Sequence, residues 1–420
     1  VPMGVSGTTN YLSVQTNDNW GFMKKLLFLV TFLISLFSSS CGNDAALMEL
    51  ANELSKKFII TDGHIDLPYR INGKYQDISG LFEGGDFDYL RAKKGGLDVP
   101  FMAIYVSASY QKTGGAKEKA DSLIDLVNEI ATKDPDKFEI AYNVEDAERI
   151  FSQGKIALPM GIENGAAIEK DLSNLKHFYD RGIRYITLTH SKDNLICDSS
   201  YDTTRTWGGL SSFGKKVVGE MNRLGIMVDI SHVTDEVINQ IFDMTNVPVI
   251  ASHSSCRKFT PGWERNMGDK EIIRLKENGG VIQINFGSAF LTQESQDKRN
   301  ENNKRVEAYK NQYNLKDEDK KLLAFREKIY KRNPIYADVK DVVKHIDHVV
   351  NIAGIDHVGL GSDYDGVGDS LPYGLKDVSF YPNLIFHLLK SGYSEEEIEK
   401  ICYKNIWRVW KAVEKTAARS

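Results

Sequence analysis

The chain has 420 residues, of which 41% are hydrophobic and 26% are charged, so it is long enough to bury a full core. Its formal net charge is -5, and no long run of like charge stands out. Nucleic acids are held through basic surfaces, so this charge balance gives no support to a nucleic-acid partner. We expect a globular protein of enzyme size.

A secretory signal is predicted near the N-terminus, over residues 23–41. Met23, Lys24 and Lys25 precede an apolar run too short to span a bilayer, and small residues lead up to Cys41. This arrangement resembles a bacterial lipoprotein signal, in which the cysteine carries the lipid. We expect export to the periplasm or cell surface with a lipid anchor at Cys41. A plain cleaved signal and an uncleaved anchor are the alternatives.

Residues 1–22 show neither a charge pattern nor an apolar period, and the signal opens at an internal methionine. We therefore expect the true start at Met23, with residues 1–22 outside the fold. Residues 42–420 are expected to form one catalytic domain, because no linker rich in Pro, Gly or Ser divides them. Without Cys41, an odd number of cysteines remains, which allows at most one disulfide bridge. These are Cys197, Cys256 and Cys402.

Short apolar runs rich in β-branched residues alternate with longer amphipathic stretches along the chain. This alternation predicts parallel strands joined by helices. Eight such units favour a closed (β/α)8 barrel over an open doubly wound sheet, and no G-x-G-x-x-G follows the first strand to mark a dinucleotide site. The strands are expected at residues 58–64, 101–107, 155–163, 183–190, 226–232, 247–253, 280–286 and 357–363.

A densely charged segment, residues 292–332, separates the seventh and eighth expected strands. Lys, Glu, Asp and Asn surround scattered apolar residues such as Leu322, Leu323 and Phe325. We expect a helical insertion whose charged side chains form a solvated face; a binding tail is the less favoured alternative.

Polar side chains stand at the ends of six expected strands. In a (β/α)8 barrel the active site forms where the carboxyl ends of the strands converge, so these side chains are expected to meet. A single histidine at a strand end is more often a hydrogen-bonded structural residue, whereas agreement among six strand ends indicates a site. The residues are His64 and Asp66, Glu163, His190, His232, His253 and Asp363.

The residue types at these strand ends predict a metal centre. His64 and Asp66 are two apart on an extended chain, so both side chains point to one face and can bind one cation. Three imidazoles and two carboxylates suit zinc better than calcium or magnesium. Five ligands exceed one tetrahedral site, so we expect two zinc ions bridged by Glu163. His64 and Asp66 then bind one ion, and His232 and His253 bind the other. Such a pair can activate a water for attack at neutral pH.

Six separated segments carry a resemblance to a known family: D-G-H-I-D at 62–66, G-I-E-N-G at 161–165, D-I-S-H at 229–232, S-H-S-S at 252–255, E-R-N at 264–266 and G-S-D-Y-D-G at 361–366. From about residue 50 onward, the chain resembles the membrane (renal-type) dipeptidase family of zinc peptidases. The resemblance implies hydrolysis of small dipeptides, tolerance of a D-residue at the C-terminal position and a homodimer. It implies the same five metal ligands.

The resemblance also implies three further roles. His190 is similar to the histidine that polarises the scissile carbonyl, and Arg265 to the arginine that holds the substrate carboxylate. Asp363 is similar to the residue that acts as acid and base.

Two other functions stay open from the sequence. One is a different binuclear metal-dependent hydrolase, acting as an N-acyl amino acid deacylase or a lactam hydrolase, because one barrel supports many chemistries. Arg265 argues for the dipeptidase, since a carboxylate anchor is superfluous for a substrate that lacks this group. The other is a catalytically silent, metal-binding lipoprotein, against which Asp363 argues.

The remaining candidates are expected to play supporting parts. Five histidines on helices or at a strand start are expected to be structural, namely His177, His345, His348, His357 and His387. Two aspartates are expected to orient imidazoles from behind, namely Asp62 and Asp365. Four loop aromatics are expected either to roof the pocket or to pack in the loops, namely Tyr201, Trp207, Trp263 and Tyr364.

Overall fold

The computed structural model describes residues 1, 3–4, 7, 43–73 and 76–417. The chain divides into two compact units, Val1–Glu49 and Leu50–Ser420. The expected signal over residues 23–41, with Cys41, lies outside the described residues, so export and lipidation stay predictions. In the part of the chain that is described, no helix has both the length and the apolar character needed to cross a membrane.

Eight parallel strands close into a barrel within the unit Leu50–Ser420, with the neighbour order β1-β10-β9-β8-β7-β6-β5-β2. This confirms the (β/α)8 prediction, and each expected strand overlaps one strand of the barrel. The strands are β1 Ile60–Ile65, β2 Leu97–Tyr105, β5 Met160–Glu163, β6 Ile183–Thr187, β7 Met227–Asp229, β8 Ile250–Ser254, β9 Val281–Ile284 and β10 Val358–Leu360.

The expected third strand at residues 155–163 is wrong as a single strand. Its first half, β4 (Ile156–Leu158), pairs with β3 (Phe138–Ile140) in a separate two-stranded sheet, while only Met160–Glu163 enters the barrel. Pro159 stands between the two halves and has no N–H to donate to a ladder, which explains the break.

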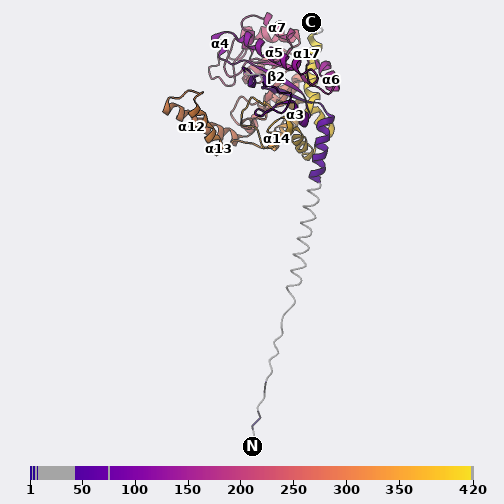
Figure 1. Ribbon diagram of the computed structural model, residues 1–420, viewed down its shortest axis with the longest axis vertical. Coiled ribbons are helices and arrows are strands. Elements are labelled where there is room, and N and C mark those ends of the chain that lie inside the picture. Colours follow the sequence, from indigo (N-terminus) through magenta and orange to yellow (C-terminus); the bar gives the residue numbers. More distant parts are fainter. Residues whose placement is uncertain (2, 5–6, 8–42, 74–75, 418–420) are drawn as a thin grey trace. The chain divides into compact units, whose positions relative to one another are not determined.

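Helices follow the strands in chain order, as expected for a (β/α)8 barrel. Their bounds are α2 Leu67–Arg70, α3 Tyr89–Gly95, α4 Tyr110–Thr113, α5 Ala116–Lys133, α6 Val144–Ser152, α7 Ser173–Asp180, α8 Ser212–Leu224, α9 Asp235–Met244, α10 Asp269–Asn278, α11 Ser288–Leu291, α12 Gln293–Tyr313, α13 Lys320–Arg332, α14 Val339–Ala353, α15 Tyr381–Lys390, α16 Glu395–Glu399 and α17 Asn405–Ala417. The helices α12 and α13, between β9 and β10, are the expected insertion, and Figure 1 shows them projecting from the barrel.

The C-terminal helix α17 packs against the amino-terminal end of the barrel. Trp407 and Trp410 lie in one buried apolar cluster with residues at the starts of strands, such as Val99 and Met227. The indole N–H of Trp407 also donates to Oγ1 of Thr61 on β1 at 2.9 Å. Because this end is filled by α17, the carboxyl end of the barrel is left to carry the polar residues.

Packing holds the described barrel together without a disulfide. Cys197, Cys256 and Cys402 are all buried and free. Burial raises the pKa of the Cys402 thiol to about 12, so it behaves as a small apolar group in the core.

Candidate active site

Glu163, the last residue of β5, places its carboxylate among four imidazoles. Its Oε1 lies 3.1 Å from Nε2 of His232, 3.4 Å from Nε2 of His253 and 3.5 Å from Nε2 of His190. Its Oε2 lies 3.7 Å from Nε2 of His64. The two oxygens of one carboxylate therefore face two different sets of nitrogen atoms.

The side chains from the other strand ends complete the cluster. Nε2 of His64 lies 3.5 Å from Oδ2 of Asp66, which follows β1 directly. Seven of the eight residues predicted for the site thus come together. Three groups have ligand atoms within 4.8 Å of one another: His64, Glu163 and His253; Glu163, His190 and His232; and His64, Asp66 and Asp363.

The nitrogen atoms in this cluster are arranged as the ligands of a cation would be. Nε2 of His232 and Nε2 of His253 are only 2.8 Å apart, and Nε2 of His64 is buried without a hydrogen-bond partner among the described residues. Burial lowers the pKa of His232 and of His253 well below the usual value, so both rings are neutral. Neutral imidazoles and carboxylates aimed at one space fit a divalent transition metal.

Two hydroxyl groups orient the imidazoles from behind. The Tyr185 hydroxyl lies 2.8 Å from Nδ1 of His64, and the Ser252 hydroxyl lies 2.7 Å from Nδ1 of His253. Ser252 Oγ donates to Oδ2 of Asp229 at 2.6 Å, so it accepts from the Nδ1–H of His253. A proton fixed on Nδ1 leaves the Nε2 lone pair for a metal.

Asp363 follows β10 with its backbone in the left-handed region, at a φ of 63°. Its Oδ2 accepts a hydrogen bond of 2.8 Å from the amide of Asn285. Burial, and then the charge of Asp66, raises the pKa of Asp363 well above its usual value. A carboxyl group in this setting holds a proton that it can give to a substrate.

His190 and Arg265 differ in their exposure to the cavity. His190 lines it, with a side chain that is 22% exposed, and burial lowers its pKa so that the imidazole is neutral. Arg265 is only 2% exposed and lies beside the cluster, with Nη2 3.0 Å from Nε2 of His232. Its guanidinium also donates to Oγ of Ser254 and to the carbonyl of His253, each at 2.9 Å.

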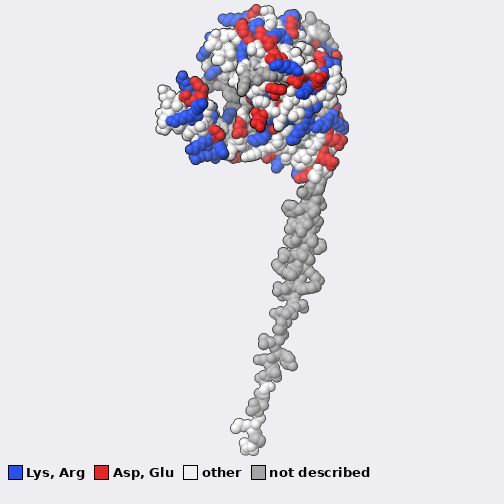
Figure 2. All heavy atoms as spheres, in the orientation of Figure 1, with Lys and Arg blue, Asp and Glu red and all other residues white. Residues whose placement is uncertain are grey.

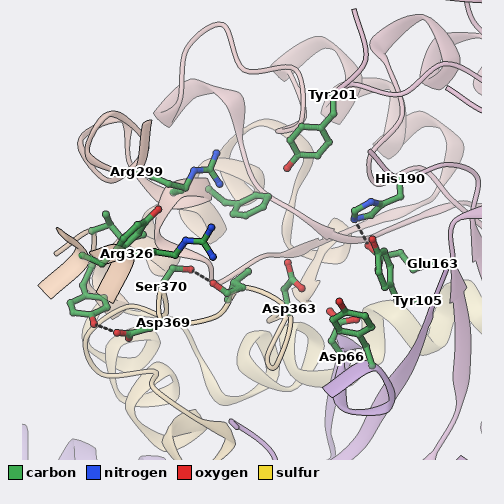
Figure 3. Close-up of a pocket in the computed structure, with 18 of the residues that line it drawn as sticks. Asp66, Tyr105, Glu163, His190, Tyr201, Arg299, Arg326, Asp363, Asp369 and Ser370 are labelled. Carbon is green, nitrogen blue, oxygen red and sulfur yellow. Dashed lines mark hydrogen bonds and ion pairs between the residues drawn. The ribbon is translucent and has the colours of Figure 1, made fainter. Parts of the chain in front are cut away.

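A cavity of about 820 Å³ opens over the cluster. Figure 3 shows Asp66, Glu163 and His190 on one side of it, with Arg299 and Arg326 on the other. Both arginines belong to the insertion, Arg299 to α12 and Arg326 to α13. The expectation that the insertion presents only a solvated face is therefore wrong in part, because one side of it forms a wall of the cavity.

Comparison with known proteins identifies the family of this chain. The sequence profile described as membrane dipeptidase (peptidase family M19) matches residues 48–420. The chain belongs to this family. Among its relatives, an uncharacterized dipeptidase of Schizosaccharomyces pombe is 34% identical over 373 residues, which cover 85% of this chain and 81% of that protein. Dipeptidase tcpJ of Claviceps purpurea is 33% identical over 374 residues, which cover 85% of this chain and 77% of that protein.

Solved structures of dipeptidases share the fold of this family member. The probable dipeptidase PvdM of Pseudomonas aeruginosa matches with a TM-score of 0.77 and 26% identity, covering 89% of this chain and all 100% of its own. A metallopeptidase of Rhodobacter sphaeroides, liganded with a phosphinate mimic of L-Ala-D-Ala, matches with a TM-score of 0.69 and 23% identity. That match covers 85% of this chain and 99% of its own. As a member of the membrane dipeptidase family, this chain is a metal-dependent peptide-bond hydrolase.

The two aspartates expected to orient imidazoles do something else. Oδ1 of Asp62 accepts the backbone N–H groups of His64 at 2.9 Å and of Ser362 at 3.0 Å, so it joins the ends of β1 and β10. Oδ2 of Asp365 pairs with Nε of Arg70 at 3.1 Å. Within the described residues, neither carboxylate bonds to an imidazole ring of the site. The orienting groups are the hydroxyls described above, which the sequence alone did not reveal.

The four loop aromatics divide between the cavity and the loops. Tyr201 lines the cavity, whereas Trp207 is exposed and Trp263 packs on Phe290, with the ring centroids 4.9 Å apart. Tyr364 is fully buried, which agrees with the alternative that it packs within its loop.

The histidines expected to be structural have partners outside the cluster. The ring of His345 bonds to the backbone N–H of Cys256 at 2.9 Å, and His357 bonds to a backbone carbonyl at 2.8 Å. His348 and His177 each lie 2.8 Å from a carboxylate oxygen. In the described part of the chain, none of these four joins a candidate metal group.

Proposed function

We propose that this enzyme hydrolyses dipeptides with two zinc ions that share the carboxylate of Glu163. The observation that carries the proposal is the division of that carboxylate, with Oε1 facing His232 and His253 and Oε2 facing His64. His64 and Asp66 would hold one ion, and His232 and His253 the other. When bound, zinc lowers the pKa of a coordinated water and polarises a carbonyl.

Two side chains supply the proton and the hydrogen bond that peptide cleavage needs. Asp363, kept protonated by burial, gives its proton to the nitrogen of the leaving amino acid. The neutral imidazole of His190 faces the cavity and donates to the carbonyl oxygen as negative charge develops there. The chain itself forms no covalent bond to the substrate in this scheme.

Arg265 is proposed to bind the C-terminal carboxylate of the dipeptide. Its guanidinium lies beside His232, and its Nε is buried without a hydrogen-bond partner among the described residues. A buried donor without a partner costs free energy, and a carboxylate offers the acceptor that it lacks. This anchor places the scissile carbonyl next to the cluster.

Tolerance of a D-residue at the C-terminal position is part of the proposal. The metallopeptidase of Rhodobacter sphaeroides was liganded with a mimic of L-Ala-D-Ala. The cavity of about 820 Å³ lies within the upper range of small-ligand sites, which leaves room for either configuration.

Zinc titration of chelator-stripped enzyme tests this function. The rate of L-Ala-L-Ala hydrolysis should rise until two equivalents of zinc are bound, and L-Ala-D-Ala should be cleaved by the same preparation. A plateau at one equivalent would contradict the shared carboxylate, and cleavage of the L-L dipeptide alone would contradict the relaxed stereochemistry.

We also propose, from the sequence alone, that the enzyme is exported, anchored by lipid on Cys41 and paired as a homodimer. The signal-like segment over residues 23–41 supports export and lipidation, and the resemblance to the family supports the dimer. Expression in a bacterial host should place the enzyme in the membrane fraction, and Cys41→Ser should release it. A soluble wild-type enzyme would contradict the anchor, and a monomeric mass in light scattering would contradict the dimer.

A further inference from the structure

The helical insertion brings more positive than negative charge to the cavity. Its two helices are joined by stacked rings of Tyr309 and Phe325, 3.8 Å apart, and by a hydrogen bond of 2.7 Å from the Tyr330 hydroxyl to Asn303. Figure 2 shows basic side chains gathered on the lobe that they form. The insertion contributes three cations and one acid to the lining of the cavity. Its lining residues are Arg299, Leu323, Arg326, Glu327, Tyr330 and Lys331.

Neither arginine of this wall has a carboxylate partner. In the described residues Arg299 and Arg326 make no ion pair, whereas Arg305, on the same helix as Arg299, pairs with Glu301. Nε of Arg299 is buried without a hydrogen-bond partner, and its guanidinium rests over the ring of Trp263 at 5.1 Å. The Arg299 guanidinium is therefore held in place by the ring, while its Nε–H has no acceptor among the described residues.

In the described residues, neither acid at this wall forms an ion pair with its arginines. Asp369 accepts a hydrogen bond of 2.7 Å from the Tyr336 hydroxyl, and Glu327 lines the cavity with an exposed side chain. The charges of Arg299 and Arg326 both reach Tyr330, where they oppose the rise in pKa that burial causes. The two cations therefore act on one part of the cavity.

This part of the cavity lies on the same side as Arg265. The Arg265 guanidinium stacks over Phe290 at 5.2 Å, Phe290 packs on Trp263, and Arg299 covers Trp263 in turn. Desolvation raises the pKa of Tyr201, and the charges of Arg265 and Arg299 both oppose that rise, so both cations lie near the phenol. Two packed aromatic rings, Phe290 and Trp263, thus connect Arg265 with Arg299.

We propose that Arg299 and Arg326 form a subsite for a carboxylate on the side chain of the substrate's C-terminal residue. The preferred substrates are then dipeptides that end in aspartate or glutamate. This inference rests on the proposed function, because Arg265 must hold the C-terminal carboxylate for that side chain to face the insertion. A guanidinium binds a carboxylate in two parallel hydrogen bonds, which a neutral amide of the same shape cannot match.

The test compares kcat/KM for L-Ala-L-Glu and the isosteric L-Ala-L-Gln with the zinc-loaded full chain. The wild type should favour the glutamate substrate by about tenfold, the effect of a charge-assisted hydrogen bond. Arg299→Met and Arg326→Met should each reduce this ratio toward one. Lys328→Met should keep it, because Lys328 is exposed on α13 and does not line the cavity. Arg326→Glu should shift the preference toward L-Ala-L-Lys.

The other outcomes overturn the inference in distinguishable ways. Cleavage of L-Ala-L-Gln and L-Ala-L-Glu at equal efficiency would refute the subsite and leave the dipeptidase function intact. The assignment to the C-terminal residue would be refuted if the kcat/KM ratio of L-Glu-L-Ala to L-Gln-L-Ala exceeded the ratio of L-Ala-L-Glu to L-Ala-L-Gln. No zinc-dependent cleavage of any of these dipeptides would refute the proposed function and the subsite together.

Discussion

The hydroxyl of Tyr185 lies 2.8 Å from Nδ1 of His64, and both side chains are fully buried inside the barrel. The contact joins β6 to β1, because Tyr185 is the third residue of β6. Gly161 on β5 makes room for it, since a Cβ at this position would lie 2.1 Å from the phenol ring. A metal ligand in this site is thus fixed by residues of two other strands.

Replacing Tyr185 by Phe should weaken metal binding while the fold is kept. Loss of a group that orients a ligand commonly costs about 10- to 100-fold in metal affinity. Competition with a chromophoric chelator measures this. Tyr403→Phe is the control, because its hydroxyl bonds to Glu399 away from the site. Equal zinc affinity in wild type and Tyr185→Phe would show that the hydroxyl does not orient His64.

Asp363→Asn should lower kcat by about 10²- to 10⁴-fold, the usual contribution of a general acid, with zinc content unchanged. The amide cannot deliver a proton to the leaving amine, while its size is nearly that of the carboxyl. Steady-state rates on L-Ala-L-Ala, with metal analysis of the same samples, give the answer. A variant with a near-normal kcat would remove Asp363 from the proposed mechanism.

Zinc should stabilise the folded enzyme strongly. The cluster buries neutral imidazoles beside carboxylates, and an ion that binds only the folded state adds about 2.7 kcal/mol at one hundred times its dissociation constant. Thermal unfolding with zinc and with chelator measures the difference. His232→Ala should reduce the stabilisation by zinc. His177 lies in a surface ion pair, so His177→Ala should leave the stabilisation by zinc unchanged. An equal Tm with zinc and with chelator would argue against a metal centre here.

Asp98 should make stability depend on pH. Burial raises its pKa from 3.8 to about 7, with the charge of Lys93 opposing the rise. Between these values the folded chain keeps a proton that the unfolded chain releases, so stability falls as pH rises through this window. The full penalty is on the order of 4 kcal/mol.

Asp98→Asn should therefore lose less stability between pH 4.5 and pH 8 than the wild type does, as measured by urea unfolding with chelator present. Asp136→Asn, at an exposed turn, serves as the control and should follow the wild type. Parallel pH curves for wild type and Asp98→Asn would show that Asp98 titrates normally in the folded protein.

The site residues at the strand ends could be predicted from the sequence, because the end of each strand can be located along the chain. Glu163 is the last residue of a buried strand, and His64 and His253 are each the last but one. A parallel barrel brings such ends together whatever the register. The orienting hydroxyls depend on register between strands. Nothing local in the sequence distinguishes Tyr185 from other buried aromatics, and only the barrel sets it opposite Gly161.

The part of the insertion that faces the cavity could not be predicted from the sequence either. Its charge density predicts solvated helices, and much of its surface is solvated. The cavity is itself open to water, so Arg299 and Arg326 satisfy the same pattern while facing the site. Composition cannot tell these two environments apart.

The most direct test of the central claim is hydrolysis of a panel of L-L dipeptides, L-D dipeptides and matched N-acyl amino acids by the purified enzyme, with zinc and with chelator. We expect zinc-dependent release of free amino acids from dipeptides of both kinds, and none from the N-acyl compounds. Cleavage of the N-acyl compounds alone, or of no compound, would contradict the account and point to a deacylase or to a silent metal-binding protein.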